Sequence, residues 1–104
     1  MKTADIKTID ILTKTWFDKV NGNTYFAQKI VINYGRKNEK HLINGFQYGY
    51  SSFDYFALQF VQRELKLKTN LNNYELCSSH GKIIMRSQTI KNCKKRDLYN
   101  IGNE

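Results

Sequence analysis

The sequence contains no proline and only 6 glycines, which excludes a collagen-like chain and a proline-rich linker. Its 2 cysteines, Cys77 and Cys93, are too few for a disulfide framework in 104 residues, so both thiols are expected to be unpaired. No apolar run approaches the length of a transmembrane helix, and no apolar segment follows the first residues as in a secretory signal. These absences predict no membrane contact and a cytoplasmic location.

Acidic side chains are the minority among the charges, 9 against 17 basic ones, which leaves a formal net charge of +8. Such a charge attracts polyanions or acidic protein surfaces. Lysine supplies most of it, and lysine suits diffuse attraction to phosphates better than bidentate recognition of a base. With a hydrophobic share of 40%, the chain is expected to form a single domain over residues 1–104.

Alternating apolar and polar residues predict two long strands joined by a turn at Asn21-Gly22, because both residue types accept turn conformations. Shorter segments of the same kind predict three further strands. The expected strands are residues 6–17, 24–34, 40–47, 74–77 and 82–90. Gly45, inside the third strand, indicates a bulge or a close approach of another backbone.

Between the third and fourth strands the hydrophobic period lengthens from two to three or four residues, which predicts an amphipathic helix over residues 52–66. Its apolar face is expected to contain Phe53, Phe56, Phe60 and Val61, and a buried Phe60 would lose about 3–5 kcal/mol on substitution by alanine. The order β-β-β-α-β-β predicts an α+β fold, a small antiparallel sheet covered by one amphipathic helix. Residues 91–104 form a basic and then polar tail whose conformation the pattern leaves open, a flexible one included.

Two segments resemble a pattern of short uncharacterised bacteriophage proteins: WFDKVNGNTYFA at residues 16–27 and FQYGY at residues 46–50. The similarity spans positions 16–50, roughly a third of the chain. It implies a small protein of a phage or another mobile element, and it implies no catalytic residue. In the second segment, Tyr48 and Tyr50 lie between an expected strand and the expected helix, where binding loops are common. Their rings either stack on a partner or pack under the helix.

The most positive stretch is residues 82–96, which contains six basic residues and no acidic one. Such a stretch either neutralises phosphates in salt-sensitive binding or forms a solvated face with a basic tail. The candidate residues for binding a partner or a nucleic acid are Lys82, Arg86, Lys91, Lys94, Lys95 and Arg96, together with Tyr48 and Tyr50. Reversal of Arg86, Lys94 and Lys95 to glutamate is expected to weaken a partner complex at least about tenfold.

Residue types for catalysis or metal binding are sparse. Cys77 and His80 have a Cys-x2-His spacing, but Cys93 and His41 lie far away in sequence, which leaves the set incomplete for a structural zinc site. The same Cys–His pair lacks an evident acid to orient the histidine for nucleophilic catalysis. No pair of carboxylates and no glycine-rich phosphate loop has a suitable spacing. We therefore expect a protein that is not an enzyme and uses no cofactor or metal.

These observations favour a small phage or mobile-element protein that binds and inhibits a host protein or a protein–nucleic acid complex, such as a defence nuclease, through a basic surface. Two alternatives are a stand-alone nucleic-acid-binding accessory protein and a minor virion component whose sheet edge pairs with a copy of itself. Nucleic-acid affinity that falls steeply with salt favours the first alternative. Assembly into a ring or filament favours the second.

Overall fold

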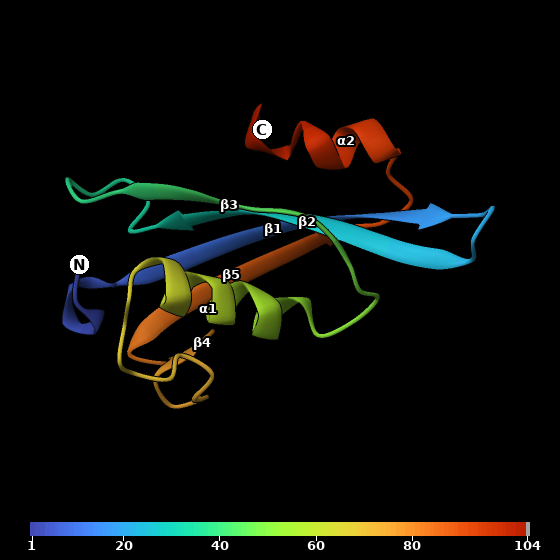
Figure 1. Cartoon of the computed structure of the whole chain (residues 1–104). Helices are drawn as coiled ribbons and strands as arrows, with labels where there is room; N and C mark the ends of the chain where they lie inside the picture. The colour runs from blue at the N-terminus through green and yellow to red at the C-terminus, as the bar shows by residue number, and fades with distance from the viewer. Residues whose placement is uncertain (104) are drawn as a thin grey trace.

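The computed structural model describes residues 1–103 and confirms the α+β class and the order β-β-β-α-β-β. The strands are β1 (Thr8–Asp18), β2 (Asn23–Ile32), β3 (Lys40–Tyr48), β4 (Cys77–Ser78) and β5 (Ile83–Ile90). The helices are α1 (Phe53–Glu64) and α2 (Lys95–Tyr99), with short 3-10 turns η1 (Thr3–Asp5) and η2 (Ile101–Asn103). Figure 1 shows a sheet with α1 on one face and α2 on the other.

The first hairpin is confirmed, with β1 and β2 antiparallel from Ile9 opposite Ile32 to Asp18 opposite Asn23. Gly22 closes the turn in the left-handed region at a φ of 71° and donates its backbone N–H to the Asp18 carbonyl over 2.7 Å. β3 continues the antiparallel pairing on the far side of β2. Its register shifts next to Gly45, so the expected bulge is present.

The strand order is β3-β2-β1-β5-β4, and β5 runs parallel to both β1 and β4. The sheet is therefore mixed, and the expectation of a wholly antiparallel sheet was wrong in this half. The cause is α1, which returns the chain along the sheet so that β5 begins at the same end as β1 (Figure 1). Such a crossover is how parallel strands are joined.

The face of α1 that contacts the sheet agrees with the expected one only in part. Val61 is buried as expected, and Ala57 and Leu58 are buried with it, whereas Phe56 is 37% exposed and Phe60 is only partly buried. Because Ala57 has a small side chain, the helix backbone lies close to the sheet and the larger phenylalanine rings lie at its margins. The helix also begins and ends inside the expected range of 52–66.

The second face of the sheet is partly covered by the C-terminal segment. Leu98 of α2 and Ile101 of η2 are each 1% exposed and pack with Ala27 of β2. The expected tail is therefore a packed element over its described part. The sequence pattern missed it because two buried side chains in so short a helix produce no recognisable period.

Candidate functional site

The structure divides the six expected cations among different places. Lys82 and Lys91 lie at opposite ends of β5, which at about 3.3 Å per residue separates them by roughly 25–30 Å. Arg86 lies between them and forms an ion pair with Asp10, which is its neighbour in the parallel register. The Arg86 Nε to Asp10 Oδ1 distance is 2.7 Å, and the Nη2 to Oδ2 distance is 3.0 Å. The sequence predicted that no acidic residue neutralises residues 82–96. For Arg86 this prediction was wrong, because Asp10 of β1 forms an ion pair with it.

Four of the six cations, Lys91 among them, lie near the turn that joins β1 to β2. We define the basic end as Lys19, Lys91, Lys94, Lys95 and Arg96, all of which are exposed. Lys19 of the hairpin turn and Lys94 line one hollow beside Trp16 and Cys93, which brings the two segments together. Within residues 1–103, the side chains of Lys91, Lys94 and Arg96 form no ion pair or hydrogen bond.

Two carboxylates lie at the basic end, and both are already engaged by the protein. Asp97 accepts a hydrogen bond from the Lys94 backbone N–H over 2.8 Å. Asp18 accepts bonds from the Asn21 side-chain amide and from the Val20 backbone N–H, over 2.8 and 3.0 Å. The bond from Asn21 is the main reason why the pKa of Asp18 is lowered, and nearby Lys95 adds to it. Local bonds therefore engage both side-chain oxygens of Asp18 and Oδ2 of Asp97.

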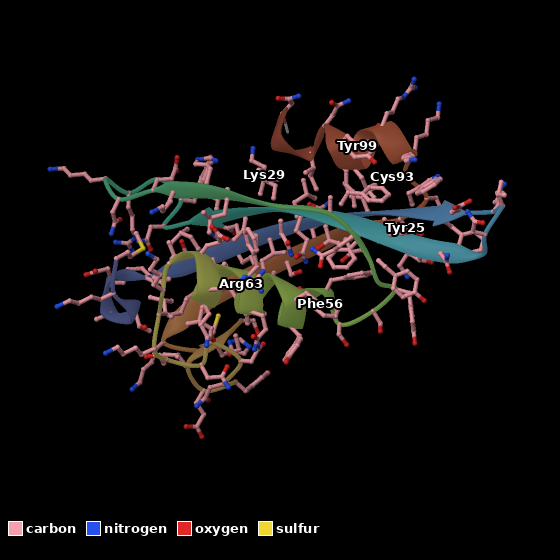
Figure 2. All side chains as sticks on the ribbon, viewed as in Figure 1. Tyr25, Lys29, Phe56, Arg63, Cys93 and Tyr99 are labelled. Atoms are coloured by element: carbon pink, nitrogen blue, oxygen red, sulfur yellow. The ribbon has the colours of Figure 1, made fainter. Side chains whose placement is uncertain are left out.

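A column of aromatic rings supports the basic end on the face that carries α2. Trp16, Tyr25, Phe46 and Tyr99 stack in that order, with ring centroids 5.7, 5.0 and 5.0 Å apart. Lys95 Nζ lies 5.6 Å from the centroid of Trp16, within the range of a cation–π interaction. In Figure 2, Tyr99 lies on α2, Cys93 lies in the segment that leads into α2, and Tyr25 lies on the sheet below them. This packing fixes α2 and its cations on the sheet.

The two expected binding tyrosines lie on opposite faces of the sheet. Tyr48 shares the face of the aromatic column and meets Tyr25 edge to face, with 5.9 Å between the centroids. Tyr50 lies on the other face, where it lines a hollow of about 250 Å³ with Lys91. The structure thus brings Tyr50 together with one cation of the basic stretch and separates it from Tyr48.

Close packing and a partly buried hydrogen bond hold the walls of this hollow in place. Gly49 donates its N–H to the Thr24 carbonyl over 3.0 Å, and a Cβ at Gly49 would lie only 2.6 Å from Phe26 Cε1. Gln28 donates from its side-chain amide to the Phe53 carbonyl over 2.8 Å. Glycine at position 49 therefore lets the loop lie against the sheet, and Gln28 anchors the start of α1.

Cys77 and His80 do not form a reactive pair. Cys77 is 4% exposed, and burial raises the pKa of its thiol to about 11, with Asp54 adding to the shift. His80 is exposed in the turn after β4. Over residues 1–103, no group of three or more His, Cys, Asp or Glu side chains is placed to hold a metal ion. Neither thiol takes part in a disulfide, as expected.

Alkylation without reductant is expected to distinguish the two thiols. A buried thiol with a raised pKa presents little thiolate at about pH 8, so Cys77 should react slowly in the folded protein, while the more accessible Cys93 reacts first. Mass spectrometry should show one label on the native protein and two after denaturation. Fast double labelling of the native protein would contradict the packing around Cys77.

Sequence reasoning missed Lys19 and the aromatic column as parts of this site. Trp16, Tyr25 and Phe46 were visible as aromatics of the segments 16–27 and 46–50, but Tyr99 gave no signal because its contact with Phe46 spans more than fifty residues. No described helix is long and apolar enough to cross a membrane. Comparison with models of protein families, with curated proteins and with solved structures found no match.

Proposed function

We propose that this chain is a small, non-catalytic protein of a phage or another mobile element that binds and inhibits a host protein or a host protein–nucleic acid complex. Binding is through the basic end. The observation that carries the proposal is the gathering of five cations at one end of the sheet, one of which lies over an aromatic column, beside two carboxylates that are already hydrogen-bonded. A surface of this charge is complementary to an acidic or phosphate-lined channel.

The non-catalytic part of the proposal is supported by the chemistry of Cys77 and His80. A thiol nucleophile needs a lowered pKa and access to solvent, and Cys77 has neither. The chain then acts by occupying a surface. Blocking a nucleic-acid channel requires shape and charge, and a small sheet with the basic end provides both.

Affinity capture from a host lysate tests the proposal, with the tagged full-length chain as bait and nuclease treatment in one of two parallel samples. We expect one host protein at near-equal ratio to the bait in both samples if the contact is to protein, and in the untreated sample alone if nucleic acid is part of the complex. The captured enzyme should then lose activity when the purified chain is added. A captured enzyme that keeps full activity under saturating chain would rule out inhibition.

A stand-alone nucleic-acid-binding role is the second candidate, and the exposed tyrosines favour it. Tyr48 and Tyr99 are 61% and 64% exposed and contact the aromatic column over which Lys95 lies, an arrangement typical of surfaces on which bases stack. This role predicts tight binding to naked single strands that weakens steeply with salt.

A further inference from the structure

Four aromatic side chains in the described part of the chain have no partner ring and no cation over them: Phe17, Tyr34, Tyr50 and Tyr74. Phe17 and Tyr50 line the same hollow, although they come from β1 and from the loop after β3. Phe17 is 50% exposed and Tyr50 is 73% exposed. Two unpaired rings thus meet at one place on the surface, and their faces are free for a planar ligand.

The rest of the hollow supplies hydrogen-bonding groups without partners. Lys91, Asn92, Thr15 and Thr24 line it, and none of their side chains forms a hydrogen bond within residues 1–103. Asn92 has a φ of 60°, in the left-handed region that asparagine adopts more readily than most residues with a side chain. The residues that line the hollow with the two free rings therefore carry one ammonium group, one amide and two hydroxyls.

We propose that this hollow binds one nucleotide of a single-stranded nucleic acid, with the base against Phe17 and Tyr50 and a phosphate at Lys91. Base stacking on aromatic rings is the usual means by which proteins hold single strands. The amide of Asn92 and the two threonine hydroxyls match the polar edge of a base, which both donates and accepts hydrogen bonds. The volume of about 250 Å³ is below the roughly 300–1,000 Å³ of pockets that enclose a drug-sized ligand, so it suits a single base.

The hollow differs in chemistry from the rest of the basic end. Lys19, Lys94, Lys95 and Arg96 attract any polyanion or acidic surface, whereas free rings beside an amide and hydroxyls recognise a flat heterocycle. An acidic protein segment would use Lys91 but would leave both rings without a function. The inference rests on the proposed function, because it assigns the hollow to the nucleic acid of the proposed host complex.

The test compares two strands that carry the same phosphates. One is a fluorescein-labelled oligothymidylate of about fifteen nucleotides, and the other is an abasic strand of the same length. Fluorescence anisotropy at low salt should show that the wild-type chain binds the oligothymidylate about tenfold more tightly, the size of effect that a stacked base gives. The double variant F17A/Y50A should bind both strands equally and as weakly as the wild type binds the abasic one.

The matched control is the double variant Y34A/Y74A, which removes the other two unpartnered rings, 67% and 77% exposed and outside the hollow. It should keep the full preference for the strand with bases. If F17A/Y50A fails to fold by circular dichroism, Y50A alone serves, since Tyr50 is largely exposed. Equal affinity of the wild type for both strands, or a preference that survives F17A/Y50A, would overturn the inference.

The same experiment separates this inference from the proposed function. If the wild type binds neither strand but still captures and inhibits a host protein, the nucleotide site is wrong and the proposed function stands. If the wild type prefers the strand with bases but inhibits no captured host protein, the site stands and the inhibitory role falls.

Discussion

Reversal of three charges at the basic end, K91E, K94E and R96E, should weaken the partner complex at least about tenfold. These side chains form no internal ion pair or hydrogen bond in the described chain, so their charge is available to a partner. The change alters the net charge by six units at one place and turns attraction to an acidic surface into repulsion. Surface plasmon resonance against the captured partner measures the loss, and most of it should vanish at high salt because the contact is screened there.

A matched control carries the same charge change at the opposite end of the molecule. Lys2, Lys66 and Lys68 line one exposed hollow beside the N-terminal segment, so K2E/K66E/K68E reverses three clustered cations far from the hairpin tip. It should leave the affinity within about threefold of the wild type, through long-range attraction alone. Equal losses in the two triple variants would mean that net charge, and no particular surface, determines binding.

The structure changes which residues should be reversed. The sequence pointed to Arg86, Lys94 and Lys95. Glutamate at position 86 would place a second carboxylate against Asp10 in place of the ion pair. Glutamate at position 95 would remove the cation that lies over the Trp16 ring. A loss of binding in that triple variant would therefore have two causes, the lost charge at the interface and the destabilised fold, which the measurement does not separate.

The second large effect is expected on stability, from Phe26→Ala. Phe26 is fully buried and packs against Phe53 and Phe56 of α1, with centroids 5.0 and 5.7 Å away. Its removal leaves a cavity between α1 and the sheet and should lower the free energy of unfolding by about 3–5 kcal/mol. Urea denaturation followed by circular dichroism measures the change.

Phe60→Ala is the comparison for that experiment. Phe60 is only partly buried at the margin of α1, beside Arg63, so its loss should cost about 1–2 kcal/mol. This replaces the larger effect expected from the sequence, which placed Phe60 in the core. If Phe60→Ala destabilises the protein as much as Phe26→Ala, the orientation of α1 on the sheet is wrong.

The local patterns of the sequence determined most of the secondary structure. The Asn21-Gly22 turn between alternating segments predicted the first hairpin, Gly45 predicted the bulge, and the change of period after β3 predicted α1. Each of these signals comes from residues that are neighbours in sequence, so it can be recognised before the fold is known. The total charge was equally a property of composition.

Tertiary structure alone decided the direction of β5, the packing of α2 and the composition of the candidate site. Arg86 and Asp10 are 76 positions apart, and only the parallel pairing of β1 with β5 makes them an ion pair. Tyr50 and Lys91 share a hollow, while Tyr48 lies on the opposite face, because the chain turns from β3 into α1 between the two tyrosines. Charge and stacking act through distance in space, and distances between remote segments are set by the crossover through α1, which no local pattern encodes.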